Sequence, residues 1–206
     1  MRRGRARTSG GVVRRGVRGR AAGVVRRGRA RTLAPVTADF DAIVPGDLAG
    51  AEIGPMTQAE AEEVARWSYP GIYAFYDFAS DPEGLAELLD ADRRAGLYFA
   101  VRLPGSGLIG FVETWPVAED GSVEIGFGLR PECTGRGLGL PFVRRLCDWL
   151  AKRVRLRPMA ITLRVATFNA RAITVYERAG FHPTGTEQST TGGATVQFLR
   201  MRLPVE

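Results

Sequence analysis

The chain has 206 residues, of which 45% are apolar and 25% charged, a composition that fits one globular domain plus an appendage. No apolar run approaches the roughly 18 residues that a membrane span requires, so we expect no membrane association. The formal net charge of +7 comes from residues 1–32, which carry twelve of the 29 basic side chains and no acid. Residues 33–206 therefore have a net charge of −5, which favours a cationic substrate.

The cysteine and histidine content argues against a disulfide framework and against a metal site. Cys133 and Cys147 have neither disulfide-like nor metal-like spacing, and His182 is the lone histidine. We therefore expect a cytoplasmic protein with no metal.

The N-terminus repeats an arginine-rich motif. Arg2–Thr8 recurs residue for residue at Arg26–Thr32. Glycine and like-charge repulsion oppose a helix, so we expect residues 1–49 to form a disordered Arg/Gly-rich extension and linker. It could be a solvated extension, an arm for nucleic acid, or a targeting segment. The lack of aromatic residues among the arginines weakens the nucleic-acid reading. The segment is neither serine-rich nor amphipathic, which weakens the targeting reading.

Residues 50–206 predict one mixed α/β domain. In chain order, we expect a strand at 52–56, a helix from Thr57 to Trp67 with Glu60 completing a capping box, a helix at 82–91, a hairpin of 97–103 and 108–115, a strand at 123–129, a helix at 138–154, a strand at 160–168, a helix at 170–179, and strands at 183–187 and 194–203.

A glycine-rich turn, Thr-Gly-Arg-Gly-Leu-Gly at 134–139, lies between the strand at 123–129 and the helix that follows. Small residues let the backbone approach an anion, successive N–H groups point at it, and the helix dipole adds partial positive charge. The turn therefore predicts a phosphate site.

About thirty residues later, Asn169 precedes a helix that contains Tyr176 and ends at Gly180-Phe181. Together the two segments resemble motifs A and B of the GNAT acetyltransferase superfamily, and in particular the alanine N-acetyltransferases of ribosomal proteins. The resemblance implies the GNAT fold: a mixed, mostly antiparallel sheet of six to seven strands, flanked by about four helices. The strands at 123–129 and 160–168 would splay at the acyl-CoA site. One departure is Thr134, where the family usually has Gln or Arg.

The resemblance implies acetyl-CoA as acyl donor. The backbone of Phe127, Gly128 and Leu129 would pair with the pantetheine arm. Asn169 would hold the pantetheine amides, cap the following helix, or do both. The pyrophosphate would bind the N–H groups of the turn, from Thr134, Gly135, Arg136, Gly137, Leu138 and Gly139. Arg130 or Arg136 could compensate for the contact missing at Thr134.

The same resemblance supplies catalytic candidates. Tyr176 stands where many members keep a general acid, and a phenol is protonated at neutral pH. Glu124 is the first candidate for the general base, and Glu113 on the adjacent strand is the second. Tyr73 and Tyr76, from an aromatic cluster at 67–78, are expected to contact a cationic acceptor.

We therefore expect an acetyl-CoA-dependent N-acetyltransferase that acts by direct attack of a primary amine in a ternary complex. The acceptor could be a small molecule or a protein amine, and the chain a monomer or a homodimer. The alternative is a non-catalytic acyl-CoA sensor whose arginine-rich tail binds nucleic acid. Nucleic acid is expected as a partner only through that tail.

Overall fold

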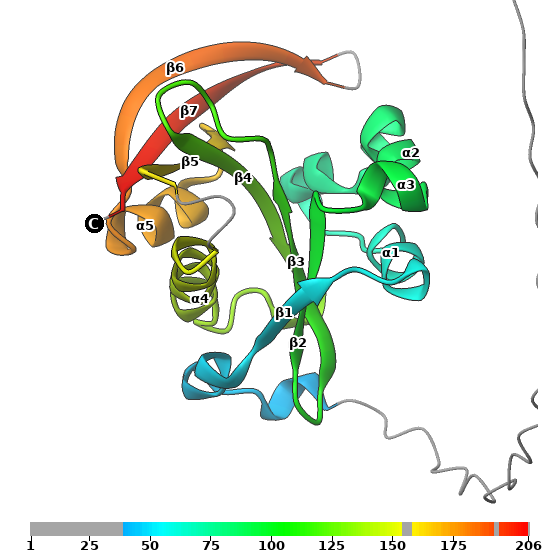
Figure 1. The fold of residues 1–206 in the computed structure, drawn as a ribbon. Helices are drawn as coiled ribbons and strands as arrows, with labels where there is room; N and C mark the ends of the chain where they lie inside the picture. The colour runs from blue at the N-terminus through cyan, green and yellow to red at the C-terminus, as the bar shows by residue number, and fades with distance from the viewer. Residues whose placement is uncertain (1–38, 154–157, 192–193, 206) are drawn as a thin grey trace, which may run out of the picture. The chain divides into compact units, whose positions relative to one another are not determined.

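The computed structural model describes residues 39–153, 158–191 and 194–205 (Figure 1). The arginine repeats of residues 1–32 and the expected helical position Val154 lie outside these ranges. None of the helices in this part of the chain is both long and apolar enough to cross a membrane.

Seven strands form one sheet in the order β1-β2-β3-β4-β5-β7-β6. All neighbouring pairs are antiparallel except β4 and β5, which are parallel. The mixed, mostly antiparallel GNAT arrangement expected from the sequence is confirmed. The strands are β1 (Glu52–Pro55), β2 (Tyr98–Leu103), β3 (Gly107–Thr114), β4 (Ser122–Leu129), β5 (Ala160–Ala166), β6 (His182–Thr191) and β7 (Ala194–Pro204).

Helices cover both faces of the sheet. Figure 1 shows α4 and α5 on one face and α1, α2 and α3 on the other. Their bounds are α1 (Gln58–Val64), α2 (Pro82–Leu89), α3 (Ala91–Arg94), α4 (Gly139–Ala151) and α5 (Ala170–Arg178). The helix expected at 82–91 is divided, because the side chain of Asp90 accepts hydrogen bonds from the N–H groups of Asp92 and Arg93 and so begins α3.

The larger hydrophobic core lies between the sheet and α4. The helix buries Phe142, Val143, Leu146, Cys147 and Leu150, whose spacing places them on one face. This packing fixes the N-terminus of α4, and with it the glycine turn, against β4.

The two parallel strands separate at their C-terminal ends. Pairing of β4 with β5 runs only from Ser122↔Ala160 to Glu124↔Thr162, although β4 continues to Leu129 and β5 to Ala166. The expected splay is therefore present, and it leaves one edge of β4 without a neighbouring strand over its last five residues.

Part of the segment expected as a linker is folded. Two short 3₁₀ helices, η1 (Phe40–Ala42) and η2 (Pro45–Gly50), precede β1. Ile43 and Leu48 are buried in the larger core. Residues 40–50 are therefore part of the folded domain, because burial of Ile43 and Leu48 in the larger core stabilises this segment.

Candidate active site

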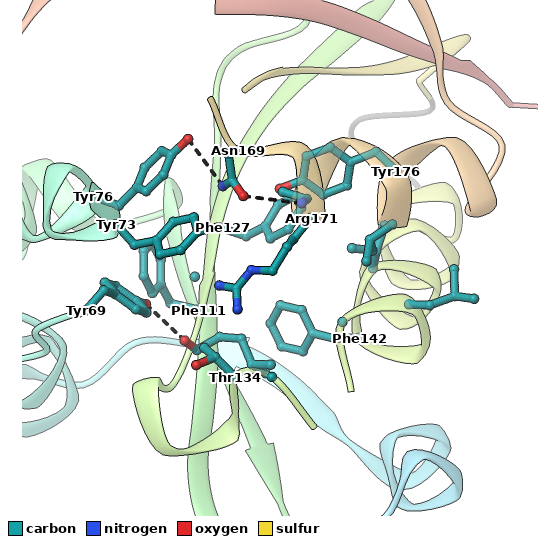
Figure 2. Close-up of a pocket in the computed structure, with 18 of the residues that line it drawn as sticks. Tyr69, Tyr73, Tyr76, Phe111, Phe127, Thr134, Phe142, Asn169, Arg171 and Tyr176 are labelled. Carbon is teal, nitrogen blue, oxygen red and sulfur yellow. Dashed lines mark hydrogen bonds between the residues drawn. The ribbon is translucent and has the colours of Figure 1, made fainter. Parts of the chain in front are cut away.

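A cavity of about 790 Å³ opens where β4 and β5 separate (Figure 2). Side chains from both faces of the sheet and the backbone of the glycine turn enclose it. Its lining includes Val64, Trp67, Tyr69, Tyr73, Tyr76, Phe78, Phe111, Glu113, Gly126, Phe127, Gly128, Leu129, Thr134, Gly135, Gly137, Gly139, Phe142, Asn169, Arg171, Val175, Tyr176 and Arg178. Of the expected site residues, Glu124, Arg136 and Leu138 do not line it.

The register of β3 and β4 decides which backbone groups face this cavity. The Trp115 N–H donates to Glu124 O at 3.0 Å, and the Arg130 N–H donates to Ile109 O at 2.8 Å. Since bonding residues alternate along an antiparallel pair, Gly128 directs its backbone groups to β3, whereas Phe127 and Leu129 direct theirs to the cavity. The Leu129 carbonyl accepts a hydrogen bond from the Tyr69 hydroxyl at 2.9 Å. Among the residues that the structure describes, the Phe127 N–H and carbonyl and the Leu129 N–H have no hydrogen-bond partner.

Gly128 keeps the cavity open because it has no side chain. A Cβ added there would lie 2.5 Å from Phe111 Cε1 and 3.0 Å from the Tyr69 hydroxyl. Only glycine therefore fits this position without displacing a ring that lines the cavity.

The glycine turn presents free N–H groups. Gly135 and Gly137 adopt φ angles of 74° and 76°, a region that glycine enters without strain. In the described part of the chain, the N–H groups from Gly135 to Leu138 donate to no protein atom. Thr134 differs, because its N–H and its hydroxyl both donate to the Pro131 carbonyl, at 3.0 and 2.8 Å. Leu138 is 1% exposed and packs in the core.

Tyr176 lies on α5, and Asn169 is the residue that caps the start of this helix. The Tyr176 ring packs edge-on against Phe127, with centroids 5.6 Å apart. Burial raises the pKa of the Tyr176 phenol above its ordinary value, so it remains protonated at neutral pH. Asn169 caps α5 by accepting a hydrogen bond from the Ala172 N–H at 3.3 Å. Its Nδ2 donates to the Tyr76 hydroxyl at 3.4 Å (Figure 2).

The two candidate carboxylates occupy different places. Glu124 Oε1 accepts a hydrogen bond from Arg164 Nε at 2.6 Å and does not line the cavity. Glu113 lines the cavity from β3, directly opposite Gly126. Burial, reinforced by the charges of nearby carboxylates, raises the pKa of Glu113 to about 7. Glu113 is therefore the carboxylate that can exchange a proton inside the cavity near neutral pH.

Comparison with known proteins identifies the family. Residues 51–182 match the family described as "Acetyltransferase (GNAT) domain". The chain belongs to the GNAT acetyltransferase family.

No curated protein sequence matches the chain. Among solved structures, it resembles a chimera of the Vibrio cholerae spermidine N-acetyltransferase SpeG with hSSAT. The TM-score is 0.62 at 22% identity, and the match covers 75% of this chain and 95% of that one. It also resembles the V. cholerae enzyme in complex with CoA and spermine, with a TM-score of 0.60 at 20% identity, over 76% and 96% of the two chains. At these identities the likeness establishes the fold.

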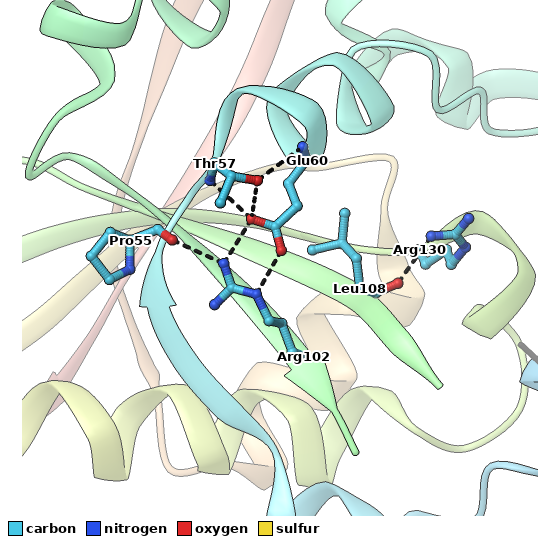
Figure 3. Close-up of polar contacts among 6 residues, drawn as sticks. All are labelled: Pro55, Thr57, Glu60, Arg102, Leu108 and Arg130. Atoms are coloured by element: carbon cyan, nitrogen blue, oxygen red, sulfur yellow. Dashed lines mark hydrogen bonds and ion pairs between the residues drawn. The ribbon is translucent and has the colours of Figure 1, made fainter. Parts of the chain in front are cut away.

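Both arginines expected to assist the GNAT phosphate turn are engaged elsewhere. Arg136 donates to the Phe40 and Asp41 carbonyls of η1. Arg130 pairs with Glu63. It also donates to the Leu108 carbonyl at 2.9 Å (Figure 3). Arg136 thus connects the turn to η1, and Arg130 connects the end of β4 to α1. Neither side chain lines the cavity.

The α1 helix that carries Glu63 is itself anchored (Figure 3). The Thr57 N–H donates to Glu60 Oε2 at 2.9 Å, which completes the expected capping box. Arg102 of β2 holds the other oxygen of the same carboxylate, with Nε 2.5 Å from Oε1. Local sequence and a long-range ion pair therefore fix the start of α1 together.

Two arginines on α5 line the cavity instead. Arg171 and Arg178 are seven residues apart, which places them on one face of the helix. The Arg171 guanidinium lies 4.3 Å from the centre of the Tyr73 ring, and Figure 2 shows it between Tyr73 and Phe142. Both residues were missed in the sequence, although their own seven-residue spacing was a signal for one shared helix face.

The two tyrosines expected at the acceptor site contact α5 and the end of β5. Tyr73 stacks on Arg171, and the Tyr76 hydroxyl accepts a hydrogen bond from the Ala166 N–H at 3.3 Å. Three further rings line the cavity and contact one another, and none of them was chosen from the sequence as an acceptor-site residue: Trp67, Phe78 and Phe111.

Neither cysteine is placed to carry an acyl group. Cys133 and Cys147 are free and buried, and burial raises the pKa of the Cys147 thiol to about 12. Within the described ranges, no three His, Cys, Asp or Glu side chains are grouped as a metal site would require.

Proposed function

We propose that the chain transfers an acetyl group from acetyl-CoA to a cationic primary amine, by direct attack in a ternary complex. One observation carries this proposal: a carboxylate, Glu113, and a protonated phenol, Tyr176, line the same cavity beside the free edge of β4. Acyl transfer to an ammonium needs a group that removes a proton and a group that supplies one.

The chain offers a matching site for the cofactor, which would supply the activated acetyl thioester. We assign the pyrophosphate to the free N–H groups from Gly135 to Leu138, at the start of α4. The pantetheine arm would pair with the backbone of Phe127 and Leu129, as an added strand pairs with a sheet edge. The Asn169 amide faces the same gap, and Arg171 and Arg178 supply positive charge along α5.

The proton balance assigns distinct roles to the two catalytic residues. Acetylation of an ammonium group releases two protons from nitrogen, while the departing thiolate takes up one. Glu113 accepts the first proton, which frees the amine lone pair for attack. Tyr176 donates to the thiolate and recovers the second proton from the new amide nitrogen. One proton per turnover must therefore leave the site.

The acceptor end of the cavity favours a cation. Asp81, Glu87 and Glu124 all act electrostatically on Glu113, so the region is negative. The rings of Trp67, Phe78 and Phe111 offer π faces to an ammonium group. Polyamines, the substrates named for the similar V. cholerae enzymes, and peptide α-amines such as an N-terminal alanine are both primary amines of this kind.

A two-part experiment tests the proposal. Acetyl-CoA is titrated by calorimetry, and thiol release is then measured with a panel of polyamines, alanine-terminated peptides, lysine peptides and aminoglycosides. We expect binding and turnover on one class, and we expect Tyr176→Phe to lose turnover while keeping affinity. Binding without turnover on any amine would favour the sensor, and no binding would reject both functions.

A further inference from the structure

We propose that Tyr98 and Glu87 form a relay that carries the proton taken up by Glu113 from the cavity to solvent. This inference rests on the proposed function, because a relay is needed only if Glu113 removes a proton from the acceptor. The residues come from β2 and α2, and neither belongs to the GNAT motifs described above.

The geometry places one buried hydroxyl between two carboxylates. Tyr98 and Glu113 are directly opposite each other in the β2–β3 register, so their side chains lie on the same face of the sheet. The Tyr98 hydroxyl acts on the pKa of the Glu113 carboxyl across this pair of strands. It also donates to Glu87 Oε1 at 3.4 Å.

The relay runs from the protein interior to the surface. Tyr98 is 2% exposed, whereas the Glu87 side chain is 27% exposed and lies 3.4 Å from the guanidinium of Arg93. Glu113 faces the cavity. A proton that enters at Glu113 can thus reach the partly exposed Glu87 through one intervening group, Tyr98.

Each turnover moves one proton without net change in the relay. Protonated Glu113 donates to the Tyr98 oxygen, and the original hydroxyl proton of Tyr98 passes to the Glu87 carboxylate. Glu87 then releases its proton to water, and the Tyr98 hydroxyl turns back toward Glu87. Burial and the two carboxylates raise the pKa of Tyr98, so the phenol remains neutral before and after transfer.

The groups around Glu113 predict opposite pH shifts for substitutions of Tyr98 and Glu87. Tyr98 on β2, Asp81 and Glu87 at α2, and Glu124 on β4 are the groups that act on Glu113. Burial raises the pKa of Glu113, the Tyr98 hydrogen bond lowers it, and the Glu87 charge raises it. Tyr98→Phe should therefore shift the acid limb of the kcat–pH profile to higher pH, and Glu87→Gln should shift it to lower pH.

The experiment measures kcat of the full chain with the best amine of the panel, at fixed pH and ionic strength, in rising imidazole concentration. We expect Tyr98→Phe and Glu87→Gln each to lower kcat about tenfold in dilute buffer, and imidazole to restore it by accepting the proton. Glu83→Gln is the control, because Glu83 is exposed one turn earlier on α2 and contacts neither Tyr98 nor Glu113.

Three outcomes would overturn the relay. An active wild-type chain whose two variants match it in kcat and in buffer response rejects the relay alone. A variant that loses activity without buffer rescue and without the expected pH shift has only a structural defect, which also rejects it. A wild-type chain inactive on every amine rejects the proposed function, and the relay with it.

Discussion

Arg164 Nε donates to Glu124 Oε1 at 2.6 Å, and the same guanidinium reaches Glu187 of β6 at 3.3 Å. Arg164 of β5 therefore links β4 and β6 at the point where β4 and β5 part. The Glu124 carboxylate is already neutralised by a cation, whereas Glu113 on the next strand has a hydroxyl and other carboxylates around it. The two acids on adjacent strands therefore differ in their partners.

This difference predicts separate effects on turnover. We expect Glu113→Gln to lower kcat by about 100-fold, the size of effect typical of losing a general base. Glu124→Gln should leave kcat within a few-fold of wild type, because its partner is Arg164. Thiol release under saturating substrates measures both. Equal losses in the two variants would return Glu124 to the role of base.

Glu113 should also make stability depend on pH. Burial raises its pKa from 4.5 to about 7 in the folded chain, so the folded state binds more protons than the unfolded state between these values. The free energy of unfolding therefore falls as pH rises through this window. Thermal denaturation should give Glu113→Gln a higher Tm than wild type at pH 8 and a similar Tm at pH 4. A lower Tm at pH 8 would show that the carboxylate stabilises the fold.

The contact between Arg136 and η1 should matter for cofactor affinity. Arg136→Ala removes two hydrogen bonds to the Phe40 and Asp41 carbonyls and frees the turn to move. We expect the Kd for acetyl-CoA to rise roughly three- to tenfold, since a hydrogen bond contributes about 1 kcal/mol. Calorimetry measures the change.

A matched control separates this effect from general loss of the N-terminal contacts. Arg145 donates from α4 to the Ala51 carbonyl at 2.9 Å but does not touch the glycine turn. Arg145→Ala should leave the Kd for acetyl-CoA unchanged. Weaker binding in both variants, or in neither, would mean that the turn does not depend on Arg136.

Gly128→Ala should disturb both the fold and the cavity. The added Cβ meets the Phe111 ring, which is packed against Trp67 and Phe78 and cannot move freely. We expect a loss of about 1–3 kcal/mol in the free energy of unfolding, together with weaker acetyl-CoA binding. Urea denaturation and calorimetry measure the two effects. Gly46→Ala, with no atom within 4 Å of the added Cβ, is the control and should match wild type.

The order of strands and helices was readable from the sequence because its signals are local. The capping box of Thr57 and Glu60 joins residues three apart, and the glycine turn needs only its own φ angles and the helix that follows. The position of Tyr176 on α5 follows from helical spacing relative to Asn169. Each of these features is specified within a few residues, so it does not depend on how the chain packs.

The choice between Glu113 and Glu124, and the partners of the arginines, depended on the tertiary structure. Arg136 and Phe40 are 96 residues apart, and Arg130 and Glu63 are 67 apart. Whether a carboxylate enters a cavity or an ion pair is set by strand register, by the point at which β4 and β5 part, and by the burial that follows. These properties arise only when distant segments pack together, because burial and charge pairing are properties of neighbours in space.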